Sequence, residues 1–289
     1  MSEENVRVDC WTPERVHKAF QAALQQPSVY SAMLPFFESV YMLQEASVAS
    51  ARPEPMRVDA QAAPPRLKSS QLTVDWPNAL HLLGSLCQQA HQANPELETA
   101  ARVIAPRLAE PGTTFKHALF PLIEDRPEAF ASAAGELGVK GDILAFFLFN
   151  SVWPSIARHA RKIAAGLNPD PDQGACPICG APPFLSLLDD EGRRGLVCSF
   201  CRHQWHAKRI FCPFCGESDN RALSYFFAEE EKAYRVHTCQ SCLKYIKNVD
   251  TRELKRLCYP PLEAVLTAHL DLSAQQLGFK SVTPVWLAL

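Results

Sequence analysis

The sequence lacks a long apolar run, an excess of charge of either sign, and any familiar catalytic signature. Its longest apolar run, Ile143–Phe149, falls well short of the roughly 20 residues that a membrane-spanning helix needs. The net charge of -2 gives no support for a basic nucleic-acid-binding face. No nucleophile elbow, phosphate-binding loop or dinucleotide fingerprint is present. The sequence therefore gives no indication of an enzyme, a membrane protein or a nucleic-acid-binding protein.

A secretory signal is also missing from the N-terminus. Met1–Asn5 is acidic and has no apolar segment, which a signal peptide requires. We therefore expect a cytoplasmic protein, in which thiols stay reduced unless a metal binds them. The 289 residues, 47% of them apolar, are typical of a globular chain long enough for two domains.

What the sequence does have is cysteine in a regular pattern. Eight of its eleven cysteines form four Cys-x-x-Cys pairs: Cys176 and Cys179, Cys198 and Cys201, Cys212 and Cys215, and Cys239 and Cys242. One turn of this spacing presents two thiolates to a metal ion, and two such turns complete a tetrahedron. The alternative is a framework of disulfides, which the predicted compartment disfavours.

The order of the pairs indicates a tandem repeat. Cys176 and Cys212 each open a Cys-Pro-x-Cys-Gly turn, whereas the other two pairs lack both proline and glycine. Within each copy, two apolar runs flank an acidic tip, Asp189–Gly192 in the first and Glu229–Glu231 in the second. We predict one four-cysteine site per copy, each with its own small antiparallel sheet, rather than sites shared between the copies. The tips are interpreted as solvated turns, the alternative being carboxylate clusters.

Metal binding would explain how such small modules fold. Each copy is too short for a hydrophobic core alone to stabilise it, while a structural four-thiolate ion contributes on the order of 10–16 kcal/mol. His203, His206 and His237 lie near enough to replace a cysteine ligand, but the eight sulfurs already complete both sites. The remaining cysteines are expected to be small buried residues: Cys10, Cys87 and Cys258.

The N-terminal half carries helical patterns and helix start signals. One helical pattern spans Ser28 to Ala49. The other predicted helices begin near Thr12–Glu14, at Asp75–Pro77, at Pro95–Leu97, at Phe115, at Glu128 and at Gly141. Pro35 either divides the second helix or marks its start, and Pro154 is expected to kink or split the last one. The prolines between Ala51 and Pro65 indicate an exposed connection.

The predicted fold class is therefore multidomain, α plus small β. We expect a helical domain over residues 1–167, rubredoxin-like or zinc-ribbon modules over 174–210 and 211–250, and a C-terminal helical segment with a tail over 251–289. His203–Ile210, with Trp205 and Ile210 inward, and Leu243–Val249 are expected to be strands. Thr251–Cys258 and Leu262–Leu270 are expected to be helices divided at Pro260-Pro261, and the tail Val282–Leu289 is expected to dock on the body.

The cysteine block resembles the formate dehydrogenase accessory protein FdhE family. The resemblance rests on Cys176–Pro183, Gly195–Cys201, Trp205-His206, Cys212–Cys215, Leu223–Tyr225, and Cys239–Cys242 followed by Lys244–Lys247. It covers roughly residues 174–249 and extends weakly into the helical half at Val152–Pro154. The Trp-His between the copies and the Lys-Tyr-Ile-Lys after the last pair make the resemblance specific.

The resemblance implies a cytoplasmic accessory factor rather than an enzyme. Such proteins bind the catalytic subunit of respiratory formate dehydrogenase before its export and hold iron in rubredoxin-like sites. The family's metal-binding cysteines correspond to the eight positions of the four pairs. Zinc remains the alternative metal, because both ions accept four thiolates in a tetrahedron. Membrane and nucleic-acid partners are not expected, and a homodimer is left open.

Two other functions remain as alternatives. One is rubredoxin-like electron transfer or redox sensing at iron. The other is a nucleic-acid-binding zinc ribbon, whose basic residues would be Lys208, Arg209, Arg235, Lys244 and Lys247, with Tyr225, Phe226 and Tyr245 for stacking.

Overall fold

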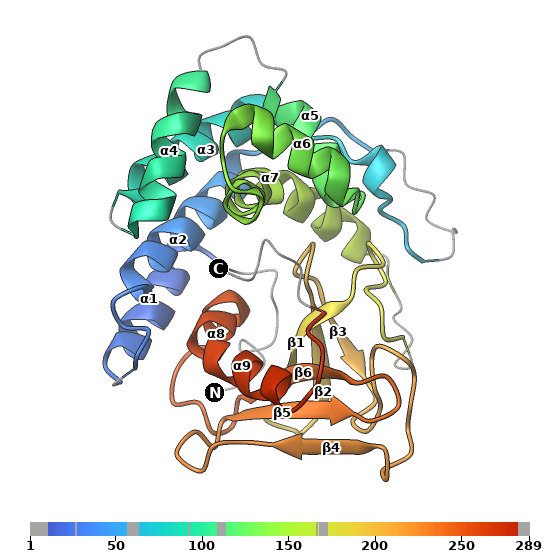
Figure 1. Cartoon of the computed structure of the whole chain (residues 1–289). Helices are drawn as coiled ribbons and strands as arrows, with labels where there is room; N and C mark the ends of the chain where they lie inside the picture. Colours follow the sequence, from blue (N-terminus) through green and yellow to red (C-terminus); the bar gives the residue numbers. More distant parts are fainter. Residues whose placement is uncertain are drawn as a thin grey trace.

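The computed structural model describes residues 11–26, 28–56, 64–91, 93–108, 114–165, 167 and 173–282. A helical lobe is followed along the chain by a sheet and then by two C-terminal helices (Figure 1). The lobe contains α1 (Pro13–Leu24), α2 (Leu34–Ser50), the 3-10 helix η2 (Ser69–Gln71), α3 (Trp76–Ala90), α4 (Pro95–Arg107), α5 (Thr114–Ile123), α6 (Pro127–Leu137) and α7 (Gly141–Ala164).

Several helices begin at the signals that the sequence predicts. The side chains of Thr12, Asp75 and Asn94 accept hydrogen bonds from backbone N–H groups at the starts of α1, α3 and α4. Each of these helices also has a proline in its first turn, where no intrahelical N–H bond is lost. Pro35 likewise lies in the first turn of α2, so it marks the start of that helix and does not divide it.

Helix α7 is buried along most of its length and lies near the centre of the lobe (Figure 1). Of the two predicted effects of Pro154, a kink or a split, the split is wrong, because α7 runs through this residue to Ala164. Because proline has no backbone N–H, Pro154 cannot donate the helical hydrogen bond to the carbonyl of Asn150. The side chain of Gln44 from α2 supplies the missing bond, since its Nε2 donates to that carbonyl oxygen at 3.0 Å. The neighbouring helix thereby satisfies the group that the proline leaves free.

The two cysteine-bearing copies form one sheet rather than two. Its strands are β1 (Pro183–Leu188), β2 (Arg194–Cys198), β3 (Gln204–Ala207), β4 (Leu223–Phe226), β5 (Tyr234–Cys239) and β6 (Lys244–Asp250), in the order β3-β2-β1-β6-β5-β4. Strands within a copy pair antiparallel, whereas β1 and β6 pair in parallel from Leu185↔Lys247 to Leu188↔Asp250. The prediction of separate sheets is corrected here. Parallel pairing joins one edge of each copy and so removes two exposed edges.

Strand β3 ends earlier than expected. Trp205 is buried as predicted, but Ile210 is 54% exposed, so its predicted inward orientation is wrong. The strand ends at Ala207, and the alternation of inward and outward residues holds only within a strand.

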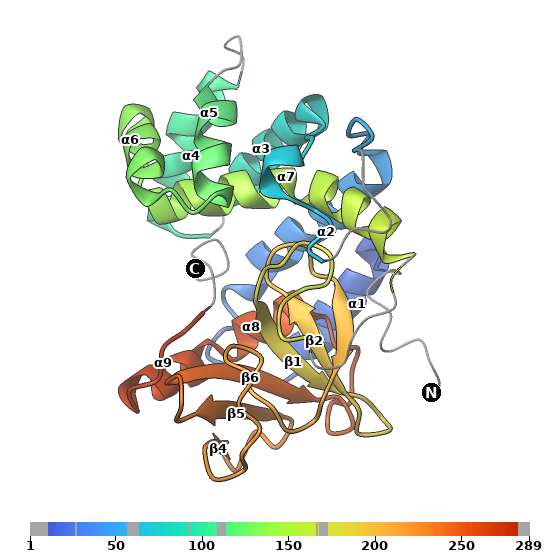
Figure 2. The same ribbon diagram turned by 90° about the vertical axis from the view of Figure 1, so that its right-hand side faces the viewer.

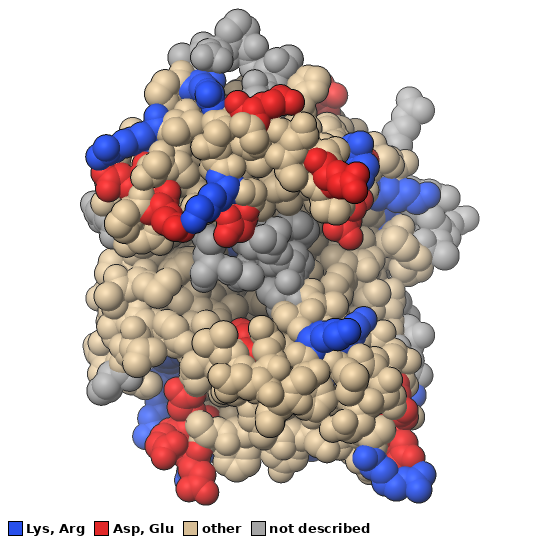
Figure 3. All heavy atoms as spheres, viewed as in Figure 1, with Lys and Arg blue, Asp and Glu red and all other residues tan. Residues whose placement is uncertain are grey.

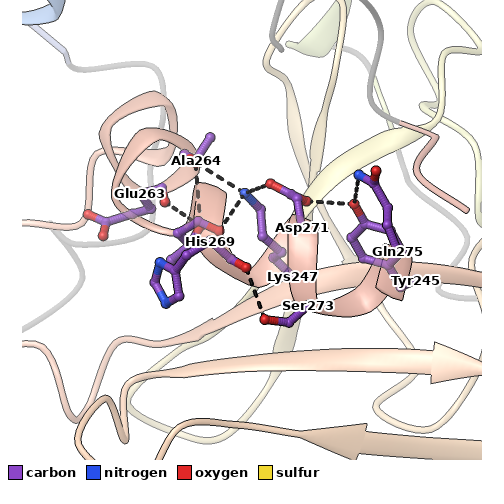
Figure 4. A network of polar contacts seen from close by, with 9 residues as sticks. Tyr245, Lys247, Glu263, Ala264, His269, Asp271, Ser273 and Gln275 are labelled. Atoms are coloured by element: carbon purple, nitrogen blue, oxygen red, sulfur yellow. Dashed lines mark hydrogen bonds and ion pairs between the residues drawn. The ribbon is translucent and has the colours of Figure 1, made fainter. Parts of the chain in front are cut away.

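The C-terminal helices α8 (Pro260–Leu266) and α9 (Ala268–Gln276) cover one face of β5 and β6. Lys247 of β6 is buried, and its Nζ donates to Asp271 Oδ2 at 2.5 Å and to the carbonyls of Ala264 and Thr267 (Figure 4). Tyr245 donates through its hydroxyl to the other oxygen of Asp271 at 2.8 Å. These bonds fix both helices to the middle of the sheet.

The segment before α8 differs from the prediction. Residues 251–258 form turns and bends rather than a helix, and Pro260-Pro261 begin α8 instead of dividing a helix. Arg256 in this segment is buried and forms an ion pair with buried Glu263, with an Nη1–Oε1 distance of 2.6 Å. The side chain therefore holds the segment in an irregular path that turn hydrogen bonds alone would not specify.

Apolar contacts join the helical lobe to both later parts of the chain. Phe149 and Trp153 of α7 share a buried cluster with Ile178, Phe200 and Trp205 from the first copy. The segment before η2 also contacts this copy, because the backbone N–H groups of Arg66 and Leu67 donate to the carbonyl of Ile178. Tyr259, just before α8, packs in the main cluster of the lobe against Trp11 and Tyr41. Figure 2 shows the sheet beneath the helices in this arrangement.

Some predictions fall outside the described residues: those for Cys10, for the docking of residues 283–289, and for the linker over residues 168–172. Among the helices that the structure describes, none has both the length and the apolar character of a membrane span.

Candidate metal centres

The first four-cysteine group lies at one end of the first copy, beneath α7. Cys176 and Cys179 come from the turn before β1, while Cys198 and Cys201 come from the end of β2 and the turn after it. The Sγ–Sγ distances are 3.6 Å for Cys176 to Cys201, 3.3 Å for Cys179 to Cys198 and 3.7 Å for Cys179 to Cys201. All four sulfurs lie within 4.8 Å of one another.

The second group repeats this arrangement in the second copy. Cys212 and Cys215 precede β4, Cys239 ends β5, and Cys242 lies in the turn before β6. The Sγ–Sγ distance is 3.7 Å both for Cys212 to Cys242 and for Cys215 to Cys239. The sulfurs are thus grouped in tandem, as the order of the pairs predicts, and not shared between the copies.

These distances fit a tetrahedral ion and exclude disulfides. Four sulfurs at about 2.3 Å from a central ion are separated from one another by about 3.8 Å. A disulfide requires about 2.05 Å, and all cysteines in the described residues are free. Each group therefore has the donor set and the spacing for one four-thiolate ion.

All four Cys-x-x-Cys turns share one backbone geometry. In each, the N–H of the residue after the second cysteine donates to the carbonyl of the first cysteine, and that residue has a positive φ. The four residues are Gly180, Arg202, Gly216 and Leu243, with φ of 76°, 58°, 79° and 55°. Glycine adopts this conformation without strain, whereas arginine and leucine do so at a cost. The turns that end at Arg202 and Leu243 therefore have the same backbone conformation as the two Cys-Pro-x-Cys-Gly turns, although they lack the proline and glycine that favour it.

Backbone N–H groups point at the sulfurs in these turns. Phe200 and Cys201 donate to Cys198 Sγ at 3.3 and 3.4 Å. Burial opposes ionisation of Cys198, but hydrogen bonds from the other cysteines of the group and from the Cys201 N–H lower the pKa of its thiol well below its ordinary value. A thiolate is the form that binds a metal.

The two groups differ in burial. In the first, Cys176, Cys198 and Cys201 are all buried, and only Cys179 is partly accessible. In the second, Cys215 is exposed and Cys242 is partly exposed. The difference arises because α7 and the segment before η2 cover the first group, whereas the second lies at the far end of the sheet from the helical lobe. An ion in the second group would be the more accessible one.

A polar and aromatic contact joins the first group to the lobe. Arg202 directly follows Cys201, is 4% exposed, and donates from Nη2 to Gln44 Oε1 at 3.0 Å. Its guanidinium lies over the rings of Trp153 and Tyr41, 3.9 and 5.3 Å from the ring centroids. No local pattern around Arg202 predicts this role; the polar Gln44 within the apolar stripe of α2 is the one sequence feature that could have indicated a buried polar partner.

The isolated cysteines have a different environment. Cys87 and Cys258 are buried, as predicted. Burial raises the pKa of Cys87 to about 12 and the pKa of Cys258 well above its ordinary value. Neither is in a four-cysteine group. These thiols are inert at neutral pH.

The candidate histidines also lie outside the groups. Within the described residues, both clusters of potential metal ligands consist of cysteine sulfurs alone, so His203, His206 and His237 are not members of either. His203 stacks on Trp205 with ring centroids 6.4 Å apart, and His237 contacts Tyr225. The interpretation of these histidines as non-ligands agrees with this geometry.

The acidic tips have structural contacts. Asp189 is buried, and its carboxylate accepts hydrogen bonds from the N–H groups of Glu191 and Arg193 and from Arg193 Nε. Burial alone would raise the pKa of Asp189, but the hydrogen bonds and the charge of Arg193 hold this pKa below its ordinary value. At the other tip, Glu231 pairs with His269 of α9 at 2.8 Å. The first tip therefore organises its own turn, and the second contacts a helix, so Asp189 is not the solvated residue that was expected.

Some of the residues proposed for nucleic-acid contact are buried and cannot reach a nucleic acid. Lys247 and Tyr245 are buried and bound to Asp271. The face shown in Figure 3 carries charges of both signs over the helical lobe and no extended field of positive charge. This arrangement gives no support to the nucleic-acid hypothesis.

Comparison with known proteins points to the same residues. The family model described as the central domain of FdhE matches residues 175–209. A protein named as an FdhE homologue from Aquifex aeolicus (strain VF5) is 35% identical over 151 residues, covering 51% of this chain and 53% of that protein. The homologue from Edwardsiella ictaluri (strain 93-146) is 34% identical over 164 residues, covering 53% and 51%. The matches thus span about half the length of these curated relatives.

The crystal structure of the FdhE protein from Pseudomonas aeruginosa has the same fold. It superposes with a TM-score of 0.70 over 96% of this chain and 97% of that one, at 20% sequence identity. The fold is therefore shared along nearly the whole chain, and the match to the family model includes the four cysteines of the first group. The chain is thus similar in sequence to FdhE homologues over about half of its length, and it shares the fold of an FdhE protein.

Proposed function

We propose that this protein is an accessory factor for the maturation of respiratory formate dehydrogenase and is not itself an enzyme. It would bind the catalytic subunit in the cytoplasm, before export. Similarity to FdhE homologues, which includes a match of residues 175–209 to the FdhE central domain, is the observation that carries this proposal. The two four-cysteine groups, held on one sheet against a helical lobe, support it because they are the features that the resemblance associates with the role.

Each group is proposed to bind one metal ion, through Cys176, Cys179, Cys198 and Cys201 in the first and Cys212, Cys215, Cys239 and Cys242 in the second. Iron is the metal that the resemblance favours, and zinc is the alternative. Thiolate donors and tetrahedral spacing suit both ions. The chemistry of the donor set therefore supports a metal without choosing between the two.

The proposed contact surface for the catalytic subunit is the face where the helical lobe meets the first copy. A cavity of about 720 Å³ lies there, lined on one side by residues at the start of α6, such as Pro127 and Phe130. Ala181 and Phe200 of the first copy line the other side. Its largely apolar walls suit an extended segment of a partner chain.

Copurification tests the proposal. The affinity-tagged protein, expressed with a formate dehydrogenase catalytic subunit, should retain that subunit, and deletion of its gene should lower formate dehydrogenase activity. Arg126→Glu, an exposed change in the lining of the proposed surface, should reduce retention, while Glu136→Lys, an exposed change on α6 that does not line it, serves as the control. Absence of association, together with normal activity in the deletion strain, would remove the proposal.

Electron transfer or redox sensing at iron in the second group is a second candidate function, because Cys215 is exposed. Electron exchange requires a partner to approach the ion, and the second group permits a closer approach than the first. Protein purified anaerobically from iron-supplied cells and then exposed to air should show the absorption of ferric thiolate and lose it on reduction. A colourless protein with stoichiometric zinc would contradict this candidate.

A further inference from the structure

A cavity of about 280 Å³ lies beside the second four-cysteine group. One wall is the loop that leads from β3 to the first cysteine turn of the second copy, including Arg209 and Phe214. The other wall is the face of β4, β5 and β6 opposite to the one that α8 and α9 cover, where Tyr225 and Ile246 line the cavity. Its volume approaches the lower end of the range of small-molecule sites, about 300–1,000 Å³.

Arg194 lines this cavity and has no carboxylate partner. It is 2% exposed, and it donates to neutral acceptors: Nε to Ser186 Oγ at 2.9 Å, and Nη1 to the carbonyls of Phe211 at 2.7 Å and Lys208 at 3.5 Å. Within the described residues it takes part in no ion pair with aspartate or glutamate. The sulfur of Cys212 is close enough to interact with this charge. Burial of a charge is costly, so an anion in the cavity would stabilise this guanidinium further.

The other charged residues that line the cavity are also cations. Arg209 is exposed at the rim, and Lys244 contributes a third cation, 5.9 Å from the centroid of the Phe214 ring. The described residues that line the cavity include no aspartate or glutamate. Cys212 and Cys239 also line the cavity, so part of this positive charge balances the thiolates of the second group. Arg209 is an exposed lining residue, and its Nη1 lies near Gly192 in the turn between β1 and β2.

Aromatic side chains form a flat wall next to these cations. Tyr225 is 61% exposed and stacks on Phe227, with ring centroids 6.3 Å apart. Arg235 lies 5.8 Å from the centroid of the Tyr225 ring. An exposed ring of this size on a strand costs free energy unless something covers it, and planar ligands stack on such rings.

We propose that this cavity binds a small organic anion with a planar ring, no larger than a mononucleotide. Its anionic group lies between Arg194 and Arg209, and its ring lies against Tyr225. Arginine suits this role because its planar donors match carboxylate and phosphate oxygens. The site adjoins the sulfurs of Cys212 and Cys239 but does not use them to hold the anion, and it is independent of any contact with formate dehydrogenase.

The test uses the metal-loaded full chain and four probes in isothermal titration calorimetry. AMP and salicylate each carry a ring and an anionic group, one a phosphate and the other a carboxylate, while inorganic phosphate lacks the ring and adenosine lacks the charge. At least one of the first two should bind about tenfold more tightly than both partial probes, a difference of roughly 1.4 kcal/mol. Which of the two binds distinguishes a phosphate ligand from a carboxylate ligand.

Two surface variants locate the binding. Arg209→Gln and Tyr225→Ala should each weaken binding about tenfold, which is the order expected for one charged hydrogen bond or one stacked ring. Arg221→Gln, an exposed arginine of the same copy that does not line the cavity, should leave binding unchanged. Metal content, measured in parallel, should be the same in all three variants.

Three results would overturn the proposal. One is the failure of all four probes to bind below about 1 mM. Another is equal binding of inorganic phosphate, which would indicate an adventitious ion only. The third is binding that neither Arg209→Gln nor Tyr225→Ala weakens. If Arg194 serves only to balance the charge of the second group, Arg194→Lys will alter metal retention while the intact protein binds no probe.

Discussion

The guanidinium of Arg202 lies 3.9 Å from the centroid of the Trp153 ring, in a contact buried between the first cysteine group and α7. Arg202 follows Cys201 directly, so the turn that positions the sulfur of Cys201 also contacts the helical lobe. Gln44 completes the contact, since it accepts from Arg202 and donates to Asn150. Arg202, whose backbone has a positive φ, therefore adds a polar and stacking contact to the apolar contacts that place the first group against the helices.

Arg202→Ala should lower the free energy of unfolding by about 2 kcal/mol or more, because a desolvated cation–π contact is lost. Arg202→Lys should also destabilise the protein, since lysine lacks the planar group that stacks on Trp153. Denaturant titration of the metal-loaded chain measures both. Leu243→Ala changes the equivalent turn residue of the second copy and is the control. An equal effect of the two alanine variants would contradict the role given to Arg202.

Leu243→Gly should be more stable than Leu243→Ala by about 1 kcal/mol, because glycine adopts the φ of 55° without the strain of a Cβ. The leucine side chain is 46% exposed, so its removal costs little packing. Thermal unfolding of the two variants under one metal-loading protocol gives the comparison. Gly216→Ala tests the same strain in reverse, since Gly216 has φ of 79° and open space around its Cβ position. A stable Gly216→Ala variant would show that the strain is negligible.

The two metal groups should differ in their response to chelator. Because Cys215 is exposed and the first group is covered by α7, the ion of the second group should be removed first. Timed removal of metal with a chelator, followed by elemental analysis, should show two phases. Cys215→Ser should abolish the faster phase and Cys176→Ser the slower one. Release of both ions in one phase would contradict the difference in access.

Cys176→Ser should also unfold the first copy, since metal binding supplies much of its folding free energy. Limited proteolysis should show increased cleavage in residues 174–210. Cys87→Ala and Cys258→Ala provide controls, because these buried thiols belong to neither group and should leave metal content unchanged. Unchanged metal content and protease resistance in Cys176→Ser would refute the assignment of the first group.

Glu45→Gln should raise the stability at neutral pH. Burial raises the pKa of Glu45, although Arg202 and Arg161 partly oppose the shift. A carboxyl whose pKa is raised on folding destabilises the native state above that pKa, and the penalty disappears as the pH falls to its unfolded value of about 4.3. The gain from Glu45→Gln should thus be largest near pH 7 and should shrink as the pH is lowered toward about 5. Denaturant titrations at both values measure it, and a constant difference would contradict the prediction.

The local parts of the fold follow from the sequence because their signals are local. The helices predicted to start near Thr12, Asp75 and Pro95 do start there, and Thr12, Asp75 and Asn94 cap them through bonds to residues three positions later. The predicted strand over residues 243–249 matches β6 closely, since its alternation is visible in the chain itself. By contrast, residues 251–258 looked helical but are held in turns by the pair of Arg256 with Glu263. That partner lies outside the pattern from which the helix was predicted.

The grouping of the eight cysteines could be read from the sequence, because two-residue spacing and the repeated Pro/Gly turns are short-range features. Only the tertiary structure decided how the copies join and how accessible each group is. The parallel pairing of β1 with β6, the stacking of Arg202 on Trp153 and the uncovered face beside Arg194 each bring together residues far apart in the chain. Such contacts depend on shape and burial across the whole molecule, and a single sequence carries no periodicity that encodes them.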